Sequence, residues 1–387
     1  MTRKVEQSFS AGCVFFSVKN SNLFKLSKNK QIEESINFII EDLRKIPNIT
    51  NISCEDIDSI RSHPDSVDWL EIPDRILVSD IPFPRFSSGV LRFEIFLSSE
   101  LQEKFSLNWK EVKSTDFIVT IYFNFEHPVC ILRPKIPHIE PDISGAVTTL
   151  WHFLRDSFNS NEFNCDFHIV GPTPFHCDFF ISKIEDDSKI EENSLPSMKM
   201  VTQPGYNDCF FEFSDTDFDL DQIQSFVFRY VVRSLGPFYF TVHSTNQIYD
   251  IRDSITEILE VIEENTKGDI KKIKSLKSYH EGFKSIPFYF VDIENIFVEV
   301  EAKLLDQNKL LSSHVFGNTL LEYANLEIKS ADMGFVERYK KLYQFISDEL
   351  RHSESTSAII TAALLGVIVG GTITMLTTIL SIYYTKT

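Results

Sequence analysis

Basic residues are scarce in this chain. Its 387 residues contain 38 Lys and Arg against 56 Asp and Glu, a formal net charge of −18 at pH 7. A chain this acidic repels the phosphate backbone, so we expect no nucleic-acid partner. Glycine is also scarce, at 13 residues, whereas 43% of the chain is apolar and 35 residues are Phe. This composition excludes collagen-like and mainly disordered chains, and it can fill a large core.

The motifs of several enzyme classes are missing. The chain has no GxxxxGK[ST] phosphate loop, no Gly-rich dinucleotide loop, no HExxH and no GxSxG. Its six cysteines are scattered and none stands in a CxxC pair, which is typical of thiols in a reducing compartment. The sequence therefore predicts neither a cofactor nor a metal site, and it favours a protein that is not an enzyme.

One stretch of the chain carries no charge. From Ala358 to Tyr384, 27 positions by count, there is no Asp, Glu, Lys or Arg. About 20 apolar residues cross the ~30 Å hydrocarbon core of a bilayer, where charges are costly. We therefore predict a single transmembrane helix over 358–384, placing the protein in the cell membrane. Flanking cations lie mainly upstream, which predicts that the bulk is cytoplasmic. They are Arg338, Lys340, Lys341 and Arg351, against Lys386 downstream.

Small side chains recur along one face of this predicted helix. Ala362, Gly366, Gly370 and Thr374 are four residues apart and therefore share a face. The Gly-x-x-x-Gly spacing lets two helices approach closely in lipid, so we expect self-association in the bilayer. The alternative is that glycine is simply common in membrane helices.

The residues before the uncharged run form an element of their own, at 331–357. Apolar side chains recur at helical spacing from Phe335 to Leu350, with charges between them. This pattern predicts a juxtamembrane amphipathic helix over 331–352. The five polar residues at 353–357 would form a joint to the membrane helix.

The body before residue 331 combines helix and strand patterns. Interspersed segments of both types predict an α+β fold with a mixed, mainly antiparallel sheet. We assign residues 1–184 and 206–330 to two α+β regions. The segment 185–205, which is acidic and contains Ser and Pro, is either a linker between them or a long loop within one domain.

The expected elements follow from hydrophobic spacing and from breakers. Helices are predicted at 32–43, 147–158, 220–231 and 251–262, the third stopped by Gly236-Pro237. Strands are predicted at 13–18, 90–97, 117–125, 129–132, 166–170, 175–182, 209–213, 238–242, 288–292 and 296–302.

The polar residues best suited to chemistry lie in two neighbouring segments. His168 follows Cys165 and Asp166, and His176, Cys177 and Asp178 come after Gly171-Pro-Thr-Pro174. If that Gly/Pro segment closes a hairpin, His168 faces Cys177 as a base beside a nucleophile, and His176 shares the other face with Asp178. Ligands projecting from opposite faces do not favour zinc. The alternative is ordinary strand residues without catalytic function.

Lysines concentrate at one place in this acidic chain. Lys271, Lys272, Lys274 and Lys277 form a patch that could bind anionic lipid headgroups or a phosphate-bearing ligand. A solvated surface is the alternative.

Three functions are consistent with these patterns. The first is a tail-anchored, single-pass protein whose cytoplasmic body binds a ligand or protein partner, including a self-associating sensor or effector of defence or stress type. The second is a membrane-tethered hydrolase or transferase that uses the His/Cys/Asp cluster. The third is an acidic membrane adaptor for a basic partner protein.

Overall fold

The structure is a computed structural model. It describes residues 3–19, 26, 28–55, 67–69, 84–86, 89–105, 114–123, 127–137, 139, 143–160, 162–172, 177–184, 197–203, 206–213, 219–266, 277–311, 315–330, 334–344 and 347–348. The chain divides into two compact units. The first comprises Met1–Ser254 and Ile293–Ala331, and the second comprises Ile255–Asp292 and Asp332–Thr387.

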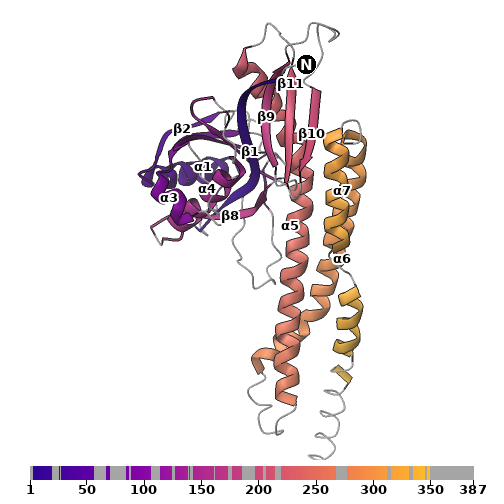
Figure 1. The fold of residues 1–387 in the computed structure, drawn as a ribbon. Coiled ribbons are helices and arrows are strands. Elements are labelled where there is room, and N and C mark those ends of the chain that lie inside the picture. Colours follow the sequence, from indigo (N-terminus) through magenta and orange to yellow (C-terminus); the bar gives the residue numbers. More distant parts are fainter. Residues whose placement is uncertain are drawn as a thin grey trace, which may run out of the picture. The chain divides into compact units, whose positions relative to one another are not determined.

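The first unit is built on a nine-stranded sheet (Figure 1). Its strands are β1 (Arg3–Val18), β2 (Ile49–Glu55), β5 (Val90–Phe96), β6 (Asp116–Tyr122), β7 (Val129–Pro134), β8 (Cys165–Pro172), β9 (Cys177–Ile184), β10 (Ser197–Gln203) and β11 (Tyr206–Phe213). They lie in the order β10-β11-β9-β1-β7-β6-β5-β2, with β8 also paired to β1. Among the described strands of this sheet, only β9 and β11 pair in parallel. The predicted α+β fold with a mixed, mainly antiparallel sheet is confirmed.

A separate two-stranded ladder lies between β2 and β5 in the sequence. It joins β3 (Val67–Trp69) to β4 (Pro84–Phe86) in antiparallel register, with Trp69 opposite Pro84.

The long first strand, β1, organises the sheet because it pairs with three others. Its first part, from Arg3 to Phe9, pairs with β9, and its second part, from Gly12 to Val18, pairs with β8. Residues Ser10–Cys13 also pair with β7. Side chains alternate between the faces of a strand, and both faces of β1 are covered, so apolar residues occur at odd and even positions alike.

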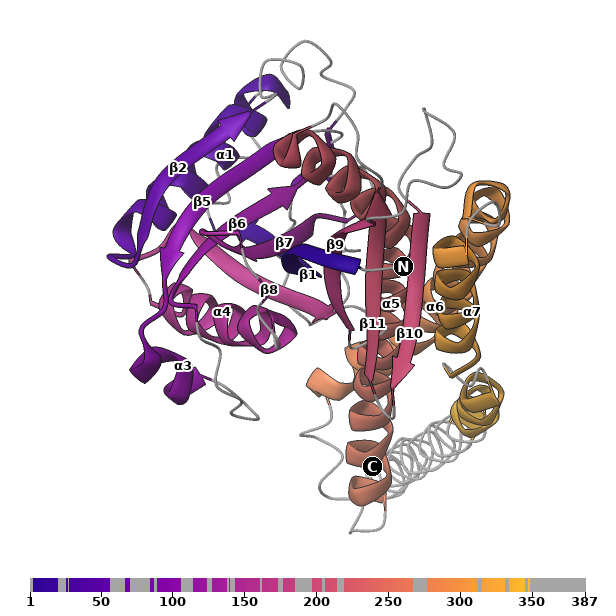
Figure 2. The ribbon, with the colours of Figure 1, turned by 45° about the horizontal axis from the view of Figure 1, so that its top comes forward.

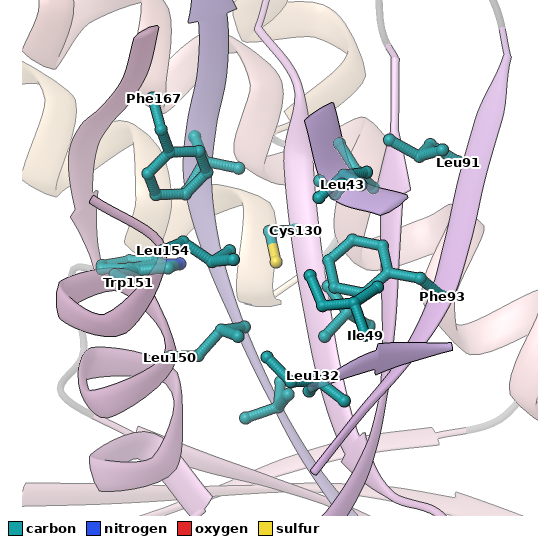
Figure 3. Close-up of a cluster of buried hydrophobic side chains, with 14 of the residues drawn as sticks. Leu43, Ile49, Leu91, Phe93, Cys130, Leu132, Leu150, Trp151, Leu154 and Phe167 are labelled. Atoms are coloured by element: carbon teal, nitrogen blue, oxygen red, sulfur yellow. The ribbon is translucent and has the colours of Figure 1, made fainter. Parts of the chain in front are cut away.

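One face of the sheet is covered by α1 (Lys28–Lys45) and α4 (Ile143–Phe158), and α3 (Ser99–Phe105) packs on α4 (Figure 2). Figure 3 shows Leu43 of α1 and Leu150, Trp151 and Leu154 of α4 meeting the strand residues Phe93 and Cys130. All are buried. The helix predictions at 32–43 and 147–158 are confirmed, because each apolar stripe lies against this core.

The other face carries a second core. Phe9, Ala11 and Cys13 of β1 pack with buried residues of α5 (Leu220–Thr266), α6 (Lys277–Leu311) and α7 (Val315–Ser330), among them Val231, Val300 and Leu320. Phe9 lies 5.1 Å from Phe179 and 4.8 Å from Phe228, measured between ring centroids. Phe9, Phe179 and Phe228 therefore pack together between the sheet and α5.

Three predicted strands and one predicted helix end are wrong. Residues 238–242 lie in α5, and residues 288–292 and 296–302 lie in α6. Short aromatic and aliphatic runs do not distinguish a strand from a helix. The helix predicted to stop at Gly236-Pro237 continues through Pro237 to Thr266, so it also contains the predicted helix at 251–262.

The segment 185–205 connects strands of one sheet. Residues 185–196 and 204–205 lie outside the described part, and residues 197–203 form β10. β9 and β11, on either side of the segment, pair from Cys177 opposite Asn207 to Lys183 opposite Phe213. Both β9 and β11 belong to the first unit.

The second unit is helical where it is described. Residues 334–344 form a helix, as predicted from the periodicity of 331–352, and Phe335 and Val336 are buried. Within this unit, Tyr339 hydroxyl lies 2.7 Å from Thr256 Oγ1, and Lys340 Nζ lies 5.9 Å from the centre of the Phe290 ring.

No helix among the described residues is long and apolar enough to cross a bilayer. The predicted transmembrane segment, 358–384, lies outside the described residues, as do Ala362, Gly366, Gly370 and Thr374 within it.

Candidate functional site

The structure places His168 on β8, in contact with a serine and a phenylalanine of β1. Pairing of β8 with β1 brings His168 opposite Phe15, and the two rings stack at 4.6 Å between centroids with 11° between planes. The Oγ of Ser17 and the Nε2 of His168 form a hydrogen bond at 2.6 Å. Burial lowers the pKa of His168 below its usual value, against an opposing effect of the nearby Asp166.

A cleft of about 570 Å³ lies beside β8, a volume typical of small-molecule sites. We name it the β8 cleft. It is lined by the ends of α3 and α4 and by three residues of β8: Lys104, Phe105, His152, Arg155, Asp156, Phe158, Asn159, Asp166, Phe167 and His168.

Both basic and acidic side chains line the β8 cleft. Lys104 Nζ lies 3.6 Å from Asp156 Oδ2, and Lys19 Nζ lies 3.0 Å from Asp166 Oδ1. Arg155 Nη2 lies 2.9 Å from His152 Nδ1, and burial together with Arg155 lowers the pKa of His152. Among the lining residues, the cations Lys104 and Arg155 formally balance the carboxylates Asp156 and Asp166, so the lining suits a polar ligand of low net charge better than a polyanion.

The predicted hairpin between the two polar segments is wrong. β8 and β9 do not pair with each other, because both run antiparallel to successive parts of β1. His168 lies opposite Phe15, whereas Phe179, the neighbour of Asp178, lies opposite Phe9. Six strand residues correspond to about 20 Å, so His168 and Asp178 do not share a site.

The other members of the predicted cluster are placed as follows. Asp178 is buried, and its Oδ1 accepts the backbone N–H of Ser144 at 2.8 Å, in the first turn of α4. Cys177 begins β9 opposite Asn207, and its side chain lies outside the described part. His176 lies outside the described residues altogether. Asp178 therefore stabilises a helix N-terminus, where a carboxylate is favourable.

The buried cysteines are poor nucleophiles. Burial raises the pKa of Cys130 to about 12, and it also raises that of Cys13 and Cys209. For Cys165, burial and the neighbouring Asp42 raise the pKa together, and Cys165 N–H donates to Asp42 Oδ2 at 2.8 Å. Because the thiolate is the reactive form, these four residues are structural.

The structure brings together a histidine pair that sequence reasoning missed. His127 is buried before β7, and its ring lies 5.1 Å from that of His243 on α5, between centroids. Phe15 contacts both His243, at 5.9 Å, and His168. No local sequence signal indicates this cluster, because a loop, a strand and a helix far apart in the chain supply it.

The Ser17–His168 pair has the composition of a nucleophile and its base. Ser17 is only 1% exposed, however, so a substrate in the β8 cleft could not reach its hydroxyl unless β8 moved. Among the described residues, no group of three His, Cys, Asp or Glu side chains could hold a metal ion. The arrangement can therefore bind a ligand, but it does not present an accessible nucleophile.

The predicted lysine patch falls mostly beyond the described part of the chain. Lys271, Lys272 and Lys274 lie outside it, and Lys277 starts α6 with a side chain that is not described.

Comparison of the chain with protein-family models, with curated proteins and with solved structures finds no match. The fold and the β8 cleft are therefore interpreted from their own geometry.

Proposed function

We propose that this chain is a single-pass membrane protein whose body binds a ligand or a protein partner at the cytoplasmic face. The observation that carries the proposal is the uncharged run of 27 positions at 358–384. A segment of this length and composition favours a bilayer over water. The excess of Lys and Arg before the run supports a cytoplasmic body.

The body is proposed to bind rather than to catalyse. The β8 cleft offers aromatic walls together with both donors and acceptors, whereas Ser17 is buried beside it. Such a lining suits a small polar molecule of low net charge. Self-association through the small-residue ridge would join several bodies, as expected of a sensor or effector that acts as an assembly.

Carbonate extraction of membranes from cells that express the full chain tests the anchor. We expect the protein to stay in the membrane pellet. Leu365→Arg with Ile368→Arg should release it, because each arginine at a helix centre costs about 2.5–3.5 kcal/mol on insertion. Release of the unaltered chain by carbonate would refute the proposal.

A matched control introduces the same charge on the body. Leu326 is an exposed residue of α7, so Leu326→Arg should remain in the pellet like the unaltered chain. Protease added to inverted vesicles should digest the body, and protease added to intact spheroplasts should not. The reverse result would overturn the orientation.

A further inference from the structure

The helix α6 carries two separate apolar stripes. The first is buried: in the first unit, Ile293, Val300 and Leu304 are all less than 8% exposed. Val300 and Leu304 belong to the core on the α5 side of the sheet, and Lys303 Nζ lies 4.5 Å from the centre of the Phe240 ring on α5. Folding of the unit itself accounts for this stripe.

The second apolar stripe of α6 is exposed. In the first unit, Val298 is 63% and Leu305 is 71% exposed. With the exposed residues Asn295 and Ala302, these positions alternate in steps of three and four. We call the four residues the α6 seam: Asn295, Val298, Ala302 and Leu305.

This spacing is that of the a and d positions of a coiled coil. Asn295 and Ala302 occupy a, and Val298 and Leu305 occupy d. Single exposed apolar residues need no explanation, but a heptad row of them on one helix indicates a surface for another helix. Polar residues such as Asn295 at an a position fix the register of a partner.

The residues that flank the α6 seam are acidic where their side chains are described. Glu299 occupies an e position, and Glu294 and Glu301 occupy g positions. The three glutamates are exposed. In coiled coils these positions choose the partner through charge pairs across the interface.

A second copy of the chain is a poor partner for the α6 seam. In a parallel pair, g faces the e residue of the next heptad, so Glu294 would face Glu299 of the other copy. An antiparallel pair would set e against e and g against g, which again opposes carboxylates. Like charges that face each other disfavour both arrangements.

We propose that the α6 seam is a docking surface for an amphipathic helix of another protein, with aliphatic residues at a and d and Lys or Arg at e and g. Apolar burial along Val298 and Leu305 would supply the attraction, and the acidic flanks would select the basic partner. The inference goes beyond the proposed membrane anchoring and does not depend on it.

Fluorescence anisotropy with designed peptides tests the docking surface on the full chain in detergent micelles. The probe is a labelled helical peptide of about four heptads, with Ile or Asn at a, Leu at d and Lys at e and g. One control peptide has Glu at e and g, and another has the probe composition in scrambled order. We expect the Lys peptide to bind at least about ten-fold more tightly than either control.

Two sets of substitutions locate the binding. Val298→Asp with Leu305→Asp should weaken binding of the Lys peptide at least about ten-fold. Glu294→Lys, Glu299→Lys and Glu301→Lys together should reverse the preference, so that the Glu peptide binds more tightly. Leu326→Asp is the matched control, since Leu326 is 60% exposed on α7 and outside the α6 seam. It should leave binding unchanged.

Three results would overturn the proposal. The Lys peptide could bind no better than its scrambled form, or it could bind equally well to the Val298/Leu305 variant. Sedimentation could also show that the chain self-associates through the α6 seam, with Val298→Asp and Leu305→Asp abolishing the assembly. Circular dichroism shows whether the aspartate variant folds. If it does not fold, the charge-reversal variant provides the test, because only docking at the α6 seam predicts that this variant binds the Glu peptide more tightly than the Lys peptide. Release of the chain from membranes by carbonate would leave these outcomes unaffected.

Discussion

At the scale of single residues, Gly12 lies at a point where three elements meet, which leaves no room for a side chain. It lies opposite Cys130 of β7 and Pro172 of β8, and a Cβ atom at this position would overlap the ring of Trp151 on α4. Trp151 is itself buried. The absence of a side chain therefore allows the indole to lie directly on the strand.

Gly12→Ala should destabilise the first unit by about 2–3 kcal/mol, because the Trp151 ring must move in a packed core. The free energy of unfolding, measured with urea on the full chain in detergent, checks this. Gly171→Ala is the matched control, since a Cβ there would meet no atom within 4 Å. A loss of stability at Gly171 equal to that at Gly12 would contradict the packing argument.

The pH response of stability should depend on His168. Burial lowers its pKa in the folded state, with Asp166 opposing, so the unfolded chain binds a proton first as the pH falls. The stabilisation is therefore complete above the unfolded pKa of about 6.5 and is lost as the pH falls below it.

Thermal unfolding of the full chain at pH 7.5 and 5.5 measures this loss. His168→Gln, which stays neutral at both values, should lose less stability between them than the unaltered chain does. Burial and Arg155 also lower the pKa of His152, so His152→Gln should reduce the loss in the same direction. An unchanged pH dependence in His168→Gln would show that His168 is not responsible.

At the scale of elements, tertiary packing carries α5 through Pro237. Leu235, Phe238, Tyr239 and Phe240 are all buried around it. A proline inside a helix costs about 3 kcal/mol or more, and burial of one large apolar side chain contributes about 1.5–3 kcal/mol. Several such side chains offset the proline, and Thr241 Oγ1 donates to the Pro237 carbonyl at 3.1 Å.

Asp178→Ala should destabilise the first unit by about 1–2 kcal/mol, because the N–H of Ser144 in the first turn of α4 loses its acceptor. Asp178→Asn should cost less, since the amide oxygen still accepts this hydrogen bond. Urea unfolding of the full chain measures both.

A control for this prediction lies at the other end of α4. Asp156 is exposed and lies 3.6 Å from Lys104, so Asp156→Asn should change stability by less than about 0.5 kcal/mol. If Asp178→Ala is equally neutral, Asp178 does not cap α4.

At the scale of the whole molecule, the chain combines a strongly acidic composition with a long uncharged segment. The chain has a formal net charge of −18, and it also has an uncharged run long enough to cross a bilayer. The net charge of the body disfavours contact with anionic headgroups, so we expect the membrane contact to come mainly from the apolar run. Assembly within the membrane would then depend on the helix surface alone.

Gly366→Leu with Gly370→Leu should weaken self-association about ten-fold or more, because leucine keeps the helix backbones apart. Sedimentation of the full chain in detergent measures the assembly. Ile368→Leu with Met375→Leu, on the opposite helix face, is the matched control and should leave it intact. An assembly that persists in the double-glycine variant would exclude the ridge as the interface.

Local periodicity predicted those helices and strands that bury one face against the core. The stripes at 32–43 and 147–158 became α1 and α4, and the alternation from Phe117 became β6. The same reasoning failed for residues 238–242, 288–292 and 296–302, because short aromatic and aliphatic runs do not distinguish a strand from a helix. The polar motif of the sequence includes His168 but not Ser17, which the structure places beside it.

The sequence by itself determined the α+β class, the acidity and the uncharged run, because composition and short-range periodicity are local properties of the chain. Only the tertiary structure decided that β8 and β9 both pair with β1, which separates His168 from Asp178 and joins His168 to Ser17. Only it decided which stripe of α6 is buried and which remains exposed. Strand pairing and burial join residues far apart in the chain, and their free energy depends on the whole core rather than on any local pattern.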